Sequence, residues 1–173
     1  MAPGPVGTPR LATVADVAVV AELLDAFNRE YDTPTPGPAV LAMRLRRLLA
    51  GESVLALLTG DPAAGLALLT LRPTIWYDDP VALLDELYVV PELRGQGLGS
   101  ALLAAAEAVT RQRGGQVLEI NVDGQDTDAR RFYERHGYSS TEPGQDQPML
   151  YYYRELGSTT FPPACRAAPA RWR

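Results

Sequence analysis

The 173-residue sequence contains no lysine, one cysteine and one histidine. Without lysine, the chain has no side chain suited to Schiff-base chemistry and cannot form the Gly-Lys phosphate loop of P-loop proteins. A single cysteine, Cys165, can form no internal disulfide, and one histidine leaves no His/Cys cluster for zinc. We therefore expect neither covalent imine chemistry nor a metal centre.

Long apolar runs and an excess of positive charge are also missing. No uninterrupted apolar stretch reaches membrane-spanning length, and the start MAPGPVGTPR lacks the basic-then-apolar pattern of a signal peptide. The formal net charge is −5, which disfavours non-specific binding to nucleic acid or anionic membranes. We expect a cytoplasmic protein that binds neither, so that an anionic ligand would need a local binding feature.

The length is typical of one domain with a sizeable core. We expect residues 1–9 to be disordered, residues 10–155 to form the single domain, and residues 156–173 to form a mobile tail. Thr13, with Asp16 three residues on, predicts a first helix, and Pro38 predicts the start of a second. Two further helices are expected from Leu98 and from Thr127. The expected strands cover residues 10–12, 53–58, 65–71, 83–90, 116–122, 138 onward and 149–155.

The most informative stretch runs from Leu83 to Leu102 and combines a strand, a glycine turn and a helix. Pro91 ends the strand because it cannot donate to a sheet ladder. Glycines let the backbone approach a ligand closely, and the first turn of the following helix presents unpaired N–H groups and a partial positive charge. The turn is therefore suited to a phosphate or pyrophosphate.

The spacing of this turn excludes the dinucleotide fingerprint G-x-G-x-x-G, because Ser100 or Leu102 occupies the third glycine position. The pattern that fits is [Gln/Arg]-x-x-Gly-x-[Gly/Ala], with Arg94, Gly97 and Gly99 directly after a strand that ends Leu-Tyr-Val-Val-Pro-Glu.

This combination resembles the acetyl-coenzyme A loop of the GNAT superfamily of N-acetyltransferases, and the similarity covers about residues 10–154. It implies an α/β (α+β) fold with a mixed, largely antiparallel sheet of about six to seven strands and helices on both faces. It also implies that the loop amides bind the coenzyme pyrophosphate while the strand backbone pairs with the pantetheine arm. The residues then expected to bind the coenzyme are Leu87, Tyr88, Val89, Arg94, Gly95, Gln96, Gly97, Leu98, Gly99, Ser100, Asp126 and Tyr133.

A second segment, from Asp126 to Tyr138, is similar to the family pattern Asn-x-x-Ala-x-x-Phe/Leu-Tyr-x-x-x-Gly-Phe, with aspartate in place of asparagine. Tyr133 matches the family tyrosine that protonates the departing thiolate. A thiol of pKa ~8.5 and a phenol of pKa ~10 differ by roughly 2 kcal/mol, which a positioned hydrogen bond can cover. On spacing alone, a core tyrosine beside Phe132 is favoured, and the resemblance reverses that order.

The acceptor amine requires a proton acceptor, because deprotonating an alkylamine of pKa ~10 at pH 7 costs about 4 kcal/mol. Asp85 and Glu86 precede the glycine turn. Alternation along a strand predicts that Asp85 shares the face of Leu87 and Val89. Adjacent acidic residues stand at both positions in the spermidine/spermine acetyltransferase branch, which this strand resembles, so both are candidates.

Two other loops mix acidic and aromatic residues that would suit a cationic amine, although loops are commonly acidic for solubility alone. These residues are Glu30, Tyr31, Asp32, Trp76, Tyr77, Asp78 and Asp79. His136 precedes the helix-ending Gly137 and is expected to interact with the last carbonyls of its helix.

We predict an acetyl-coenzyme A-dependent N-acetyltransferase that acts on a primary amine of a small, cationic acceptor without a covalent intermediate. Tyr133, Asp85 and Glu86 are the catalytic candidates. The alternatives are an acyl-coenzyme A-binding or sensing module and a protein N-terminal or lysine acetyltransferase. The sequence leaves open whether the acceptor is a polyamine, aminoglycoside, amino acid or protein N-terminus, and whether the protein forms a homodimer.

Overall fold

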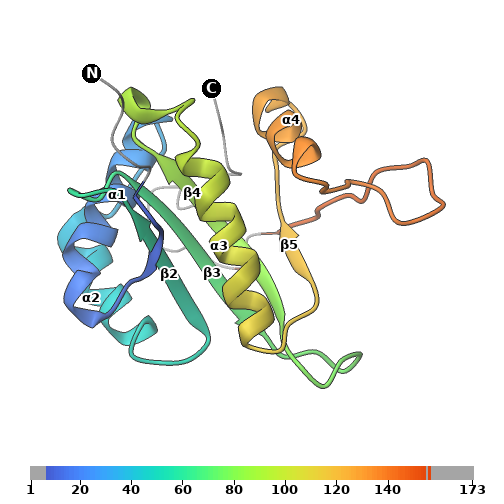
Figure 1. Ribbon diagram of the computed structural model, residues 1–173, viewed down its shortest axis with the longest axis horizontal. Helices are drawn as coiled ribbons and strands as arrows, with labels where there is room; N and C mark the ends of the chain where they lie inside the picture. Colours follow the sequence, from blue (N-terminus) through green and yellow to red (C-terminus); the bar gives the residue numbers. More distant parts are fainter. Residues whose placement is uncertain (1–6, 155, 157–173) are drawn as a thin grey trace.

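The computed structural model describes residues 7–154 and 156, and within them the helices pack around one sheet (Figure 1). Short 3-10 turns at Val14–Asp16 and Pro91–Leu93 precede α1 and the glycine turn. The elements are β1 (Arg10–Leu11), α1 (Val17–Glu30), α2 (Pro38–Leu48), β2 (Val54–Thr59), β3 (Gly65–Arg72), β4 (Val81–Val89), α3 (Leu98–Gln112), β5 (Leu118–Ile120) and α4 (Thr127–Arg135).

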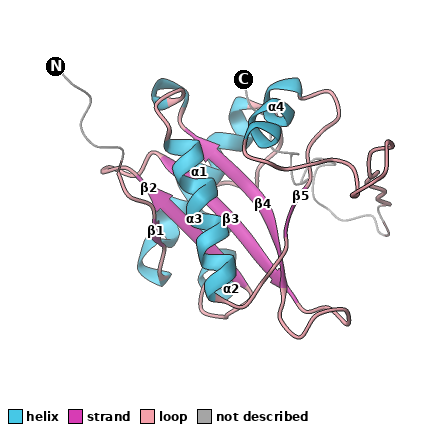
Figure 2. Ribbon diagram, turned by 45° about the vertical axis from the view of Figure 1, so that its right-hand side comes forward, coloured by secondary structure: helices cyan, strands magenta, loops and turns pink. Residues whose placement is uncertain are grey.

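The five strands lie in the order β1-β2-β3-β4-β5, and Figure 2 shows β5 at one edge. Strands β1 to β4 pair antiparallel, whereas β4 and β5 pair parallel. A parallel pair needs a crossover connection, and α3 supplies it. The predicted mixed, largely antiparallel sheet is confirmed.

Helices cover both faces of the sheet, as predicted. On one face α1 contacts β3 and β4, and α2 packs against α1; on the other face α3 contacts β2, β3 and β4. The core on the α1 face includes Phe27, Leu66 and Tyr88, and the core on the α3 face includes Leu84 and Leu102. Strand β4 contributes to both cores, so its residues reach either face of the molecule.

Local signals at two helix starts are confirmed. The Thr13 N–H donates to Asp16 Oδ2 at 2.8 Å, and the Thr13 hydroxyl accepts from the Ala15 N–H at 3.2 Å. Pro38 is the first residue of α2. Thr13 therefore caps the 3-10 turn that leads into α1, and α2 begins at the proline that the sequence indicated.

The prediction of two strands after Gly137 is wrong for the described residues, which is why the sheet has five strands instead of six or seven. Between α4 and Arg154 the backbone forms one isolated bridge, Thr141 to Pro148. Tyr151, Tyr152 and Tyr153 favour strands by propensity, but they are exposed. Propensity alone does not make a strand where no neighbouring strand pairs with it.

The predicted ends of the domain fall mostly outside the described part of the chain. Residues 1–6, 155 and 157–173 lie outside it, so disorder of residues 1–6 and mobility of the tail stay predictions. The Gly7 carbonyl accepts a hydrogen bond from the Thr59 hydroxyl, which ties the start of the described chain to β2.

Within the described residues, no helix is long and apolar enough to cross a membrane, and no group of three or more His, Cys, Asp and Glu could hold a metal ion.

Candidate active site

The glycine turn forms the wall of a pocket between β4, α3 and α4. Gly97 is the N-cap of α3 and has a φ of 87°, in the left-handed region that favours glycine. The first N–H groups of α3 have no partners within the helix and point out of its end. The pocket has a volume of about 510 Å³. Its lining residues are Val89, Leu93, Arg94, Gly95, Gly97, Leu98, Gly99, Ser100, Asp128, Arg131, Phe132 and Arg135.

Seven of the predicted coenzyme residues line this pocket, but Arg94 is already ion-paired. Its guanidinium donates to both carboxylate oxygens of Glu30 at 2.8 Å, and its Nε donates to Val89 O at 2.9 Å. The sequence placed Glu30 on the acceptor side and did not predict this pair. Gln96, outside the lining, donates to the Glu92 carbonyl at 3.4 Å.

Strand β4 parts from β5 within the site. The parallel pairing ends at Leu84 and Ile120, and no described strand pairs with this edge of β4 beyond that point. The Val90 N–H donates across the other edge to Ala64 O at 2.9 Å. Because amides alternate between the two edges of a strand, those of Leu87 and Val89 face the edge that β5 has left. These two N–H groups can bind an extended ligand or a carbonyl oxygen.

A β-bulge controls where the two acidic residues of β4 project. Leu69 pairs with Leu84 but Leu68 pairs with Glu86, so Asp85 is an extra residue. The bulge interrupts the alternation of side chains along β4. Ala82 and Leu84 before it, and Leu87 and Val89 after it, all belong to the core on the α3 face.

Asp85 and Glu86 consequently lie together on the α1 face. The Thr70 hydroxyl donates to Asp85 Oδ2 at 2.6 Å, and Glu86 pairs with Leu68, which packs against the α1-face core. The prediction that Asp85 shares the face of Leu87 is therefore wrong, because simple alternation does not allow for the bulge.

Burial changes the acidity of both carboxyl groups. Burial and the neighbouring Asp85 raise the pKa of Glu86 to about 8. Burial also raises the pKa of Asp85, opposed by the hydrogen bond from Thr70. Glu86 Oε2 is buried and has no hydrogen-bond partner among the described residues. A carboxyl group with a pKa near neutrality can exchange a proton with an amine at physiological pH.

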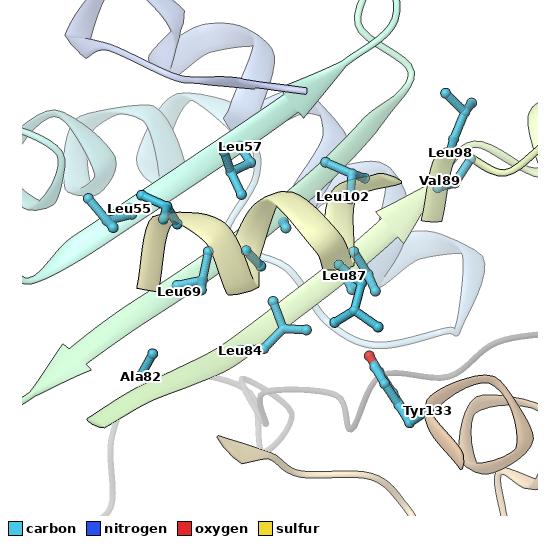
Figure 3. Close-up of a cluster of buried hydrophobic side chains, with 14 of the residues drawn as sticks. Leu55, Leu57, Leu69, Ala82, Leu84, Leu87, Val89, Leu98, Leu102 and Tyr133 are labelled. Atoms are coloured by element: carbon cyan, nitrogen blue, oxygen red, sulfur yellow. The ribbon is translucent and has the colours of Figure 1, made fainter. Parts of the chain in front are cut away.

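Tyr133 lies on the opposite side of β4. Its side chain is buried and its ring contacts Phe132 and Tyr138, with centroids 5.2 and 5.8 Å away. Figure 3 shows its hydroxyl directed towards β4 near Leu84 and Leu87. The core packing expected from spacing is thus present, and it fixes the hydroxyl at the place where β4 leaves β5.

The second family segment also contributes capping groups. Asp126 Oδ1 accepts from the Ala129 N–H at 2.9 Å and caps α4, and Asp126 is not among the residues lining the pocket. His136 Nδ1 lies 2.7 Å from Phe132 O, as expected for a histidine at a helix end. Its Nε2 lies 2.9 Å from Ser100 Oγ, a contact with α3 that the sequence did not indicate.

The two acidic and aromatic loops are separated in the structure. The loop after β3 lies at the opposite end of β4 from the glycine turn (Figure 1). A side chain added at Gly114, beyond the end of α3, would collide with Asp79. Trp76 is 81% exposed, and Tyr31 packs edge-on against Phe27. The expectation that Trp76 and Asp79 flank the same cleft mouth as Glu30 is therefore wrong.

Sequence reasoning missed the wall that α4 contributes to the pocket. Asp128, Arg131, Phe132 and Arg135 all line it. Their spacing places them on one face of a helix, and this was the available signal. The two arginines add positive charge opposite the amides of α3.

Comparison with known proteins identifies the family of the chain. Residues 18–138 match the acetyltransferase (GNAT) family. The chain is 37% identical over 87 residues to the aminoalkylphosphonate N-acetyltransferase of Salmonella typhimurium, covering 50% of this chain and 56% of that protein. It is 32% identical over 141 residues to the aminoglycoside N(6')-acetyltransferase type 1 of Stenotrophomonas maltophilia, covering 78% of this chain and 88% of that protein.

A crystal structure of a protein from Arthrobacter sp. FB24, described as an acetyltransferase, superposes with a TM-score of 0.84. The two chains are 60% identical, and the match covers 90% of this chain and all of that one. The family match spans more than half of the chain and includes β4, the glycine turn, α3 and α4. The protein therefore belongs to the acetyltransferase (GNAT) family of N-acetyltransferases, whose acetyl donor is acetyl-coenzyme A.

Proposed function

We propose that this protein transfers acetyl directly from acetyl-coenzyme A to a primary amine of a small cationic acceptor. The observation that carries the proposal is the placement of Tyr133 and the Asp85–Glu86 pair on opposite faces of β4, at the point where this strand leaves β5. A donor between the strands would meet a proton source on one face and proton acceptors on the other.

The coenzyme side of the site fits this donor. The glycine turn offers backbone amides and the positive end of α3 to the pyrophosphate. The free edge of β4 offers the amides of Leu87 and Val89 to the pantetheine arm and the thioester carbonyl. Hydrogen bonds to the carbonyl oxygen stabilise the charge that develops there as the amine attacks.

Tyr133 is the proposed proton donor to the departing thiolate. Its neighbours Phe132 and Tyr138 hold the ring in one orientation. A phenol restricted in this way can donate a proton to sulfur without first losing rotational freedom.

Glu86 and Asp85 are proposed to receive the ammonium group of the acceptor. A cationic amine close to these carboxyl groups favours their ionised forms and lowers the pKa of Glu86 from about 8. The ionised Glu86 then takes the proton that the amine must lose. Two of the relatives are named for small amine acceptors, an aminoalkylphosphonate and an aminoglycoside, and aminoglycosides are polycations.

The test measures thiol release from acetyl-coenzyme A against a panel of polyamines, aminoglycosides, amino acids and peptides, with mass spectrometry of the products. We expect acetylation of polycationic amines in preference to neutral or acidic ones. Equal rates with neutral acceptors would contradict the cationic-acceptor proposal. Coenzyme binding without amine-dependent thiol release across the panel would instead support an acyl-coenzyme A-binding or sensing module.

Coenzyme binding is checked separately by thermal shift with a matched pair of glycine variants. Gly97→Val places a side chain at a φ of 87° beside the coenzyme amides, whereas Gly124→Ala adds a Cβ in open space outside the pocket. We expect acetyl-coenzyme A to stabilise the wild type and Gly124→Ala but not Gly97→Val. No stabilisation of the wild type would remove the coenzyme from the proposal.

A further inference from the structure

The single histidine links the end of α4 to the first turn of α3. His136 Nδ1 lies 2.7 Å from the Phe132 carbonyl oxygen, and Nε2 lies 2.9 Å from Ser100 Oγ. A carbonyl oxygen can only accept, so Nδ1 carries the hydrogen. In the neutral imidazole Nε2 is then the acceptor, and the Ser100 hydroxyl donates to it.

Donation of the Ser100 hydrogen to His136 disfavours anion binding at Ser100. Ser100 lines the pocket beside Gly97 and Gly99. A serine hydroxyl has one hydrogen, and while it points at His136 the oxygen presents lone pairs to the pocket. If the imidazole gains a proton, Nε2–H donates to Ser100 Oγ and the serine hydrogen becomes free to turn towards an anion.

We propose that His136 positions the Ser100 hydroxyl for the coenzyme pyrophosphate and that coenzyme binding is coupled to uptake of one proton from solvent by this imidazole. The inference rests on the proposed function, which places the pyrophosphate at this turn.

The charges around the imidazole are consistent with this coupling. His136 lines a pocket with Glu107, Arg111 and Tyr138, and the charged groups of the adjacent pocket at the glycine turn are Arg94, Asp128, Arg131 and Arg135. Glu107 is engaged by Arg111 at 2.9 Å and by the Tyr138 hydroxyl at 3.1 Å. Asp128 lies 4.0 Å from Arg131. Arg131 and Arg135 oppose a further positive charge on the imidazole in the free protein, whereas a bound phosphate adds negative charge beside it and favours the imidazolium form.

Isothermal titration calorimetry with coenzyme A tests the coupling. The wild type is titrated at about pH 7.5 in two buffers of different ionisation enthalpy, and its dissociation constant is measured from pH 6 to pH 8. Proton exchange by the coenzyme's own phosphates is common to all variants and cancels in the comparison. We expect the wild type to take up more protons than His136→Phe or Ser100→Ala, and to gain up to about tenfold more affinity than either towards pH 6.

His136→Phe separates positioning from a purely structural role. Phenylalanine keeps a ring against Phe132, whose centroid lies 4.5 Å from that of His136, but it cannot accept from Ser100. The freed hydroxyl should give binding at pH 8 at least as tight as in the wild type, with the excess proton uptake lost. Weaker binding of the variant at every pH would assign His136 a structural role and overturn the inference.

Nuclear magnetic resonance gives a direct readout, because the only imidazole signals come from His136. We expect the Nδ1–H tautomer in the free protein at high pH, and two protonated nitrogens after coenzyme A is added near pH 7. An Nε2–H tautomer, or an imidazole unchanged by bound coenzyme, would overturn the inference while leaving the acetyltransferase proposal intact. Failure of the wild type to bind coenzyme A would overturn both.

Discussion

Arg94 and Glu30 form a bidentate ion pair in which both hydrogen bonds measure 2.8 Å. The pair joins the last residue of α1 to the start of the glycine turn, and the third bond from Arg94 reaches Val89 O at the end of β4. Arg94 thus lines the pocket at the glycine turn with its charge already paired. We therefore expect its main contribution to be to hold the turn in place.

A double-mutant cycle tests this contribution. Glu30→Gln and Arg94→Gln should each lower the free energy of unfolding by about 1–3 kcal/mol, because each leaves a partly buried partner unpaired. The double variant should recover part of the loss. Arg72→Gln is the control, since its pair with Glu119 is exposed and should contribute about 0–1 kcal/mol. Losses at Glu30 and Arg94 no larger than at Arg72 would refute a structural role for the pair.

Tyr133→Phe tests the proton donor. We expect turnover to fall by about 10²- to 10⁴-fold, with coenzyme affinity and Tm nearly unchanged, because the ring still fills its place in the core. Tyr138→Phe is the matched control: its hydroxyl donates to Glu107 at 3.1 Å, outside the proposed reaction. Equal turnover in the two variants would assign the proton to another donor.

Glu86 should make stability depend on pH. Below about pH 4.5 its carboxyl group is protonated in both the folded and the unfolded chain and causes no difference between them. As the pH rises, the unfolded chain loses this proton while the folded chain keeps it up to about pH 8, so the free energy of unfolding declines across that window.

Replacing Glu86 with glutamine should remove this decline. We expect Glu86→Gln to match the wild type near pH 4.5 and to exceed it at pH 9 by on the order of 2 kcal/mol, or several degrees in Tm. Thermal unfolding followed by circular dichroism across this range gives the comparison. Parallel pH profiles for the two proteins would show that the carboxyl group is not shifted.

Asp85 and Asp79 should affect acceptor binding differently. Asp85→Asn removes a carboxylate from the α1 face of the site and should raise KM for a cationic amine, with less dependence on ionic strength. Asp79→Asn changes an exposed carboxylate next to Gly114, at the far end of β4, and should leave KM unchanged. Steady-state kinetics at two salt concentrations measure both effects. A larger KM effect at Asp79 would indicate that the acceptor binds at the end of β4 opposite the glycine turn, which would contradict the proposed site.

The elements around the glycine turn could be predicted because local chemistry specifies them. Pro91 cannot continue a strand, Gly97 has the positive φ that the turn requires, and the apolar spacing from Leu98 marks one face of α3. The pocket lined by Gly97, Gly99 and Ser100 follows from these signals together with the family pattern.

The features that could not be predicted depend on contacts between distant segments. The bulge at Asp85 is a mismatch between β3 and β4, and neither strand alone encodes it. The Glu30–Arg94 pair spans 64 residues, and the Ser100–His136 contact spans 36. The prediction of strands after Gly137 was wrong for the same reason, because a strand requires a neighbouring strand to pair with as well as residues of high β-propensity.

The bulge also explains how two neighbouring residues of one strand can present their carboxyl groups on the same face. A substitution at Asp85 or Glu86 alters one carboxyl group and leaves the other on the α1 face. Deleting Asp85 would restore unbroken alternation: Leu84 and Leu87 would stay on the α3 face, and Glu86 would be the one carboxyl group left on the α1 face. Two adjacent carboxyl groups can share one face of β4 only because the strand is one residue longer than its partner at this point.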